Sequence, residues 1–289
     1  MRKGYLTSFI LVGPFLVAFA LFYILPVLSA IYLSLFIKKR TLTGLSSDVF
    51  GGFANYARAF GDQDFLHSLL NVVSFCLVVI PISIGSAILL ALILDELSGP
   101  ILKTGRTLLM LPYTIPVAIG SMLWGYLYSR NVSPINFVID NLHLPKIDFL
   151  APNLLVGAIA NVVIWAWTVY NMVGIYTALQ SIPRELYEAA KIDGASRFAV
   201  MRHIKLPLVM PAIRVVLLFA VIGTTQVFGE PFILRSLGYI PENITPNLYI
   251  YWIAQRDANY SYSAALAVIL AAIVFAITLL MFRRPTKAT

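Results

Sequence analysis

The sequence predicts an all-α integral membrane protein with six transmembrane helices in a single membrane domain that covers residues 1–289. The chain is 60% hydrophobic and only 12% charged, whereas soluble domains carry about 25% charged and 45–50% apolar residues. Its mean hydropathy is +0.85. This excess of apolar residues is too large for one soluble core, so a lipid bilayer must cover part of it.

Six apolar runs are long enough to cross a bilayer, because a spanning helix needs about 20 mostly apolar residues. They cover residues 9–36, 69–94, 108–129, 152–179, 207–229 and 261–282. The loops between them are rich in Gly, Pro, Asn and charge, and no internal repeat is visible.

The first run follows Met1-Arg2-Lys3 and contains Ala-Phe-Ala at 18–20, which is typical of a signal peptide. Its apolar character continues to Phe36, beyond the length of a signal-peptide core. We therefore expect an uncleaved transmembrane helix. Pro14 and Pro26 predict a kink or a tilt within it.

The second run ends at Asp95-Glu96, which we expect to be solvated at the inner surface. The fifth run starts near Pro207, where we expect a turn into the helix, and its outer end carries Glu230 as an interfacial or gate group. The only cysteine, Cys76, lies inside an apolar run, so neither an internal disulfide nor a Cys/His metal motif is possible.

The net charge of +8 is interpreted as the lysine and arginine bias of cytoplasmic loops, not as a nucleic-acid surface. The loop after the fourth run and the C-terminal tail are the clearest basic segments, although Lys38-Lys39-Arg40 opposes the trend. We expect a multi-pass membrane protein, surrounded by lipid, with both termini cytoplasmic; the family resemblance described below implies a prokaryotic cell membrane.

A polar loop over residues 181–206 separates the fourth and fifth runs. Pro183 can start a helix, and Glu185 lies early in it, where the helix dipole favours a carboxylate. Gly194 can end this helix in a left-handed conformation. Ser196 is a plausible N-cap for a second short helix, on which Phe198 belongs to an apolar stripe.

Residues 188–194 of this loop read Glu-Ala-Ala-Lys-Ile-Asp-Gly, and Ile-Lys-Leu-Pro follows at 204–207. This spacing resembles the cytoplasmic loop of permease subunits in binding-protein-dependent ABC importers. The lead-in at 180–187 is similar to the carbohydrate branch, which handles oligosaccharides, disaccharides and glycerol 3-phosphate. Gly-Pro-Phe at 13–15 is similar to the first of two sister permeases. Many relatives carry Gly-Gly-Pro after the fifth span, where residues 235–241 here read Arg-Ser-Leu-Gly-Tyr-Ile-Pro.

The resemblance implies the type I importer permease fold, with a coupling loop that sits in a cleft of an ATPase subunit and transmits its closure to the membrane helices. The implied ATPase-coupling residues are Glu188, Ala189, Ala190, Asp193, Gly194, Ala195 and Phe198. The implied partners are a sister permease, two ATP-binding subunits, an extracytoplasmic binding protein and a sugar. No cofactor is expected on this chain, because ATP and Mg would be held by the ATPase.

Polar and aromatic residues within the fourth and fifth runs are candidates for the substrate pathway, because such residues usually face a partner helix or a water-filled cavity. These candidates are Trp167, Tyr170, Asn171, Gly223, Thr224 and Gln226. In the fourth run they share one helix face with Gly174, and in the fifth they share one with Glu230. The alternative is that they only form hydrogen bonds between helices.

Two other functions agree less well with the sequence. A stand-alone secondary transporter or channel would be expected to show internal repeats or buried coupling charges, and neither is visible. A membrane-embedded enzyme would show His-Glu-x-x-His, Gly-x-Ser-x-Gly or paired intramembrane aspartates, and these are missing from the sequence. The sequence therefore favours a transport subunit that is not itself an enzyme.

Overall fold

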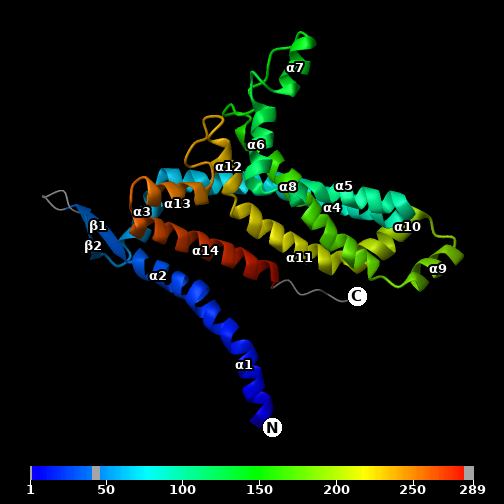
Figure 1. Cartoon of the computed structure of the whole chain (residues 1–289), viewed down its shortest axis with the longest axis horizontal. Coiled ribbons are helices and arrows are strands. Elements are labelled where there is room, and N and C mark those ends of the chain that lie inside the picture. The colour runs from blue at the N-terminus through cyan, green and yellow to red at the C-terminus, as the bar shows by residue number, and fades with distance from the viewer. Residues whose placement is uncertain (1, 41–45, 283–289) are drawn as a thin grey trace. The chain divides into compact units, whose positions relative to one another are not determined.

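The computed structural model describes residues 2–40 and 46–282, and the basic tail beyond them lies outside this range. The described residues are helical apart from one short antiparallel hairpin and the connecting loops (Figure 1). The contacts divide the described residues into two compact units, formed by residues 2–40, 46–67 and 246–279 and by residues 68–245 with 280–282. Whether they belong to one domain over 1–289 stays a prediction.

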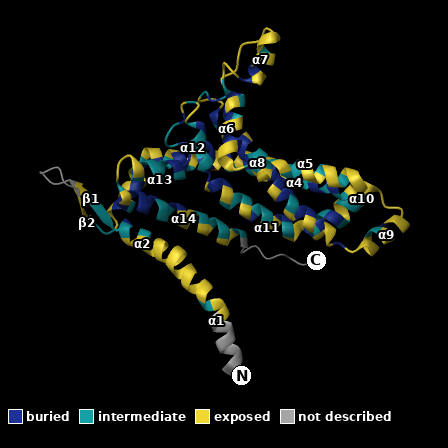
Figure 2. Cartoon of the chain, viewed as in Figure 1, coloured by how far each residue is buried: buried dark blue, intermediate teal, exposed yellow. Residues whose placement is uncertain are grey.

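The first unit begins with a long apolar helix in three parts, α1 (Arg2–Phe19), the π-helical turn η1 (Ala20–Ile24) and α2 (Leu25–Ser34). Pro26 occupies the first turn of α2. Since proline lacks the N–H that an α-helix needs there, a wider π turn just before it keeps the helix continuous. Residues 11–33 of this helix are all exposed or half-buried, and only Ser34 at its end is buried within the chain (Figure 2).

The hairpin of β1 (Phe36–Arg40) and β2 (Ser46–Phe50) leads into α3 (Ala54–Gly61), and the unit is completed by α13 (Pro246–Gln255) and α14 (Tyr260–Phe282). Asp62 links these segments, because its carboxylate accepts hydrogen bonds from the hydroxyls of Tyr249 at 2.9 Å and Tyr262 at 2.6 Å. Arg58 lies 3.9 Å above the ring of Tyr262. Burial, followed by the bond to Asp62, raises the pKa of Tyr249 well above its usual value.

The second unit is built around α4 (Gln63–Glu96), α8 (Leu155–Gln180) and α11 (Leu206–Thr225). Its core combines small residues of α4, such as Ala87 and Ala91, with larger ones, such as Met172 of α8 and Ile213 of α11. The alanines leave room for close helix approach, and the larger side chains fill the space between the helices. Figure 2 shows the buried residues of these helices in dark blue.

The third predicted span, a single helix over 108–129, is wrong in form. The structure has α5 (Gly99–Thr114) and α6 (Val117–Tyr128), which meet at an angle of 93°. Ile115 is extended because it precedes Pro116, which disfavours a helical conformation at the residue before it. Among the described residues five helices can cross a membrane, or six if this bent pair counts as one span.

The turn expected at Pro207 is also absent. After α9 (Arg184–Ile192), the helix α10 (Arg197–Val200) continues through the π turn η2 (Met201–Lys205) into α11, so the chain is helical from Arg197 to Thr225. Pro207 lies in the first turn of α11, directly after η2. As at η1, the π turn precedes a proline that cannot donate a helical hydrogen bond.

The helix expected over 207–229 ends early. Thr225 is the last residue of α11, and a separate short helix, α12 (Gly229–Leu234), follows. The remaining helix of this unit is α7 (Pro134–Asn141), which starts at Ser133, whose hydroxyl accepts the N–H groups of Ile135 and Asn136.

Candidate functional site

The coupling loop forms a short helix, α9, with defined ends. Pro183 is its N-cap residue, Glu185 lies in its first turn and Lys191 in its last, an order that suits the helix dipole. Gly194 has a φ of +71°. The N–H of Ala195 bonds to the carbonyl of Ala190 at 2.9 Å, and that of Gly194 to Lys191 at 3.2 Å. This is a Schellman ending, which explains the glycine after the Glu-Ala-Ala triplet.

The two sides of α9 differ in exposure. Ala190 is buried at 8%, whereas Glu188 and Ala189 are exposed. The large apolar side chains Ile192 and Phe198 are 86% and 63% exposed. The helix therefore rests on its own chain through one side and presents a mixed acidic and apolar surface on the other.

Ser196 caps the second helix as expected, because its hydroxyl accepts the N–H of Ala199 at 3.2 Å. Together, the Schellman ending and this cap fix a turn of four residues between α9 and α10. The predicted coupling residues Asp193, Gly194 and Ala195 all lie in this turn and are exposed.

Tyr187 and Lys205 hold the inner side of α9. The Tyr187 ring lies 5.5 Å from the ammonium of Lys205. Its hydroxyl is buried and has no hydrogen-bond partner among the described residues. Burial is the main cause that raises the pKa of this hydroxyl, and the nearby Asp95 adds to it.

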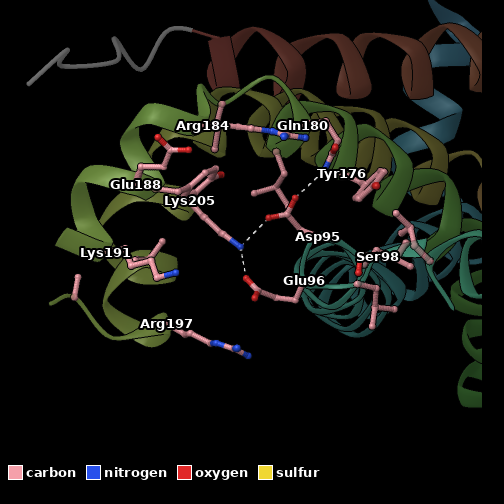
Figure 3. A pocket seen from close by; sticks show the side chains of 18 of the residues that line it. Asp95, Glu96, Ser98, Tyr176, Gln180, Arg184, Glu188, Lys191, Arg197 and Lys205 are labelled. Atoms are coloured by element: carbon pink, nitrogen blue, oxygen red, sulfur yellow. Dashed lines mark hydrogen bonds and ion pairs between the residues drawn. The ribbon is translucent and has the colours of Figure 1, made fainter. Parts of the chain in front are cut away.

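The expectation that Asp95 is solvated is wrong. Its side chain is 10% exposed and its carboxylate lies 2.7 Å from the Lys205 ammonium, whose side chain is 8% exposed. Glu96, half exposed, lies 2.5 Å from the same nitrogen. Gln180 donates to the other oxygen of Asp95 at 2.7 Å. Figure 3 shows the network, which joins the ends of α4 and α8 to the start of α11.

The signal for this network was present in the sequence, as two carboxylates at the end of one apolar run and a lysine at the start of another. Their partnership was missed because 109 residues separate Glu96 from Lys205. The network lines a cavity of about 830 Å³ between the ends of α4 and α8 and the segment from α9 to η2. This segment, residues 184–205, is called the coupling segment below. Arg184, Lys191 and Arg197 also line it, so cations outnumber carboxylates around it.

The predicted substrate face of α8 is partly present. Trp167 and Tyr170 are each 43% exposed, with ring centroids 6.0 Å apart in an edge-to-face arrangement. Tyr113 of α5 stacks on Tyr170 at 5.5 Å, and the sequence did not single it out. Three aromatic rings from two helices therefore form one exposed surface.

Asn171 does not lie on that surface. It is 3% exposed and donates to the hydroxyl of Ser83 on α4 at 3.0 Å. It lies at the edge of the predicted stripe that faces α4, where a hydrogen bond between helices satisfies its amide. Gly174, on the exposed side, allows close approach of α11, because an added Cβ would lie 3.0 Å from Val216.

The predicted stripe on the fifth span is interrupted. Gly223 is exposed and Thr224 is 4% exposed within α11, but Gln226 follows the end of that helix. Glu230 lies on α12 and is 5% exposed, so it is buried within the chain, and its role as an interfacial or gate group stays a prediction. The Trp167 side chain lies near the Glu230 carboxylate, and α8 and α12 are in contact.

Within the described ranges, no cluster of three or more His, Cys, Asp or Glu side chains could hold a metal ion. The arrangement is that of a helical membrane protein with an exposed short helix, α9, and an aromatic surface formed by α5 and α8.

Comparisons with known proteins agree with this class. Residues 49–283 match the family described as binding-protein-dependent transport system inner membrane component. The sulfoquinovosyl glycerol transport system permease protein of Agrobacterium fabrum is 30% identical over 96% of this chain and 90% of its own length. The trehalose/maltose transport system permease protein of Thermococcus litoralis is 30% identical over 80% of this chain and 77% of its own length.

Among solved structures, a chain of a bacterial alginate ABC transporter, crystallised with an alginate pentasaccharide-bound periplasmic protein, has a TM-score of 0.83. The match covers 99% of this chain and 96% of that chain, at 23% identity, and shows a shared fold. The chain belongs to the family of inner membrane components of binding-protein-dependent transport systems.

The chain is therefore a permease subunit of an ABC importer, a transport component and not an enzyme. The stand-alone secondary transporter or channel that the sequence left as an alternative does not agree with this family.

Proposed function

We propose that the chain forms half of the translocation pathway for a sugar or sugar derivative. The named substrates of the two relatives above and of the alginate transporter all contain sugar rings. The exposed rings of Trp167, Tyr170 and Tyr113 suit the C–H faces of such rings. Gly223 of α11 and Gln226 after its end are both exposed and complete the proposed pathway, whereas Asn171 and Thr224 are buried and are not assigned to its surface.

The remaining partners follow from this role. A sister permease supplies the other half of the pathway, and an extracytoplasmic binding protein delivers the sugar. Two ATP-binding subunits bind ATP and Mg on the cytoplasmic side, so both termini of this chain lie in the cytoplasm. These assignments rest on the family and on the basic character of the coupling segment.

We place the ATPase contact on the exposed side of α9 and on the turn and helix after it, while the buried Ala190 packs α9 against its own chain. The proposed coupling residues are Glu188, Ala189, Asp193, Gly194, Ala195 and Phe198. One observation carries this assignment. The inner side of α9 is held by Ala190 and Tyr187, while Glu188, Ile192 and Phe198 are exposed at the end of the helical unit. A helix fixed on one side and apolar on its exposed side fits docking into a groove of a partner.

The test is Glu188→Lys in the assembled importer, with Asp140→Lys as a control. Both residues are exposed acids, but Asp140 lies on α7, away from the coupling segment. We expect Glu188→Lys to weaken ATPase attachment about tenfold or more, because the new lysine would face a positive charge on the ATPase. A like-charge contact of this kind costs over about 1 kcal/mol. Normal ATPase co-purification and normal uptake in Glu188→Lys would refute the docking assignment.

The substrate class is tested by adding sulfoquinovosyl glycerol, trehalose, maltose and an alginate oligosaccharide separately to the binding protein encoded with this chain. A rise in its unfolding midpoint with one of them supports the sugar assignment, because a ligand that binds only the folded state stabilises it. A response to amino acids and to none of these sugars would contradict it.

A further inference from the structure

The buried ion pair beneath α9 has a geometry that the coupling role alone does not require. Both oxygens of the Asp95 carboxylate are occupied, one by Lys205 at 2.7 Å and the other by Gln180 at 2.7 Å. Three segments that are distant in the sequence thus meet at one carboxylate (Figure 3). In an ion pair on the surface, water would also bind these oxygens, and such pairs contribute little to stability.

Lys205 also lies on the segment that connects the coupling helix α9 to the membrane helix α11. It is the last residue of η2, and η2 continues directly into α11. On its other side η2 follows α10, which a short capped turn connects to α9. Isolated π turns in helices occur frequently at functional sites.

The coupling helix touches this lysine directly. The ring of Tyr187 lies 5.5 Å from the Lys205 ammonium, and Tyr187 immediately precedes Glu188 of the docking motif. A displacement of α9 therefore reaches Lys205 by two routes, through the Tyr187 ring and through the backbone of α10 and η2.

We propose that Lys205 and Asp95 are positioning residues that join the coupling segment to the end of α4, so that α4 follows α9 when the ATPase subunits close. Glu96, which is half exposed and also attracted by Arg197, is an auxiliary partner. This inference rests on the proposed docking of the ATPase at α9.

The test uses the assembled importer in lipid vesicles, with Lys205→Met, Asp95→Asn and the double variant. Met keeps the length of the side chain without its charge, and Asn can still accept a hydrogen bond from Gln180. The matched control is an exposed ion pair between Asp140 on α7 and Lys146, which follows α7. It is changed in the same way, to Asp140→Asn and Lys146→Met. Uptake is measured with the radiolabelled sugar that binds in the screen above.

We expect each single variant to lower the sugar transported per ATP hydrolysed by about fivefold or more, the lower end of coupling between distinct sites. The double variant should lose no more than either single one, because both residues serve one link. Lys205→Arg should retain at least half of the coupling, and the control pair should behave as the unchanged protein.

Three outcomes would overturn the link. The first is an unchanged ratio of transport to hydrolysis. The second is a smaller amount of assembled complex whose sugar transported per ATP hydrolysed is unchanged, because a purely structural role would give this result. The third is additive loss in the double variant. In Lys205→Met the ATPase subunits must still attach normally. The docking assignment itself is tested separately, by ATPase attachment in Glu188→Lys.

Discussion

Tyr170 carries an aromatic ring that is 43% exposed on a helix whose neighbouring residue Val169 is buried at 5%. The ring stacks on Tyr113 and meets Trp167 edge to face, so its orientation is fixed by two neighbours. Such a fixed ring loses little conformational freedom when a sugar stacks on it, which favours affinity.

Tyr170→Ala should therefore lower sugar uptake about fivefold or more, since an aromatic contact contributes on the order of 1 kcal/mol beyond its area. Tyr126→Ala is the control, because Tyr126 is also an exposed tyrosine of a membrane helix, at 50%. Protein level and ATPase attachment should be unchanged in both variants. Equal uptake in the two variants would show that the α8 surface does not face the sugar.

The buried hydroxyl of Tyr187 predicts an unusual result. Since it lacks a partner among the described residues, Tyr187→Phe should leave stability unchanged or raise it by about 1 kcal/mol. The raised pKa means that the neutral phenol stabilises the fold below its ordinary pKa of 10.0, and that this stabilisation is lost as the pH rises through the folded-state pKa.

Thermal unfolding of the purified complex at about pH 8 and about pH 10.5 checks both points. The unchanged protein should lose more stability between these two values than Tyr187→Phe. A variant that is less stable at the lower pH, or equally sensitive to alkali, would show that the hydroxyl has a partner that the described residues do not supply.

At the scale of the element, the end of α9 depends on one backbone conformation. An added Cβ at Gly194 would meet nothing within 4 Å, so a substitution acts only through the φ of +71°. Gly194→Val should cost about 1–2 kcal/mol and shift the turn between α9 and α10, whereas Gly194→Asn should cost less. ATP hydrolysis per sugar transported should rise in the first variant and stay near normal in the second.

Substitutions at two glycines of α8 distinguish the effect of packing on stability from that of helix propensity. Gly174 approaches Val216 of α11, whereas an added Cβ at Gly157 meets nothing within 4 Å. Gly174→Leu should lower stability by about 1–3 kcal/mol through overpacking. Gly157→Leu should raise it by up to about 1 kcal/mol, because glycine is a poor helix former. Thermal unfolding of both variants decides this, and similar midpoints would contradict the close approach of α8 and α11.

Elements were predictable where apolar length alone decides them. The fourth run, predicted at 152–179, is α8 at Leu155–Gln180, and the Schellman glycine and serine cap around the coupling loop followed from local rules. The break at Ile115–Pro116 could not be located in this way, because hydropathy does not separate one straight helix from two bent ones. The charges of Asp95 and Lys205 at the ends of two apolar runs are visible in the sequence, but which of these charges meet in space depends on tertiary contact.

For the whole molecule, orientation is the property that the loop charges predict and that a fusion experiment decides. A reporter fused after Arg197 or at the C-terminus should read as cytoplasmic, and one near Gly51 or Asn141 as external. The basic residues Arg184, Lys191 and Arg197 around the 830 Å³ cavity motivate this expectation. An external signal from the Arg197 fusion would contradict the ATPase assignment, because ATP is cytoplasmic.

The shared carboxylate of Asp95 also limits how this chain can be recombined with its relatives. A chimeric permease whose junction falls between residues 97 and 204 inherits Asp95 and Glu96 from one parent and residue 205 from the other. If that second parent lacks the lysine, a buried charge loses its partner, which costs about 3–5 kcal/mol. Domain-exchange experiments on this transporter should therefore place their junctions before residue 95 or after residue 205.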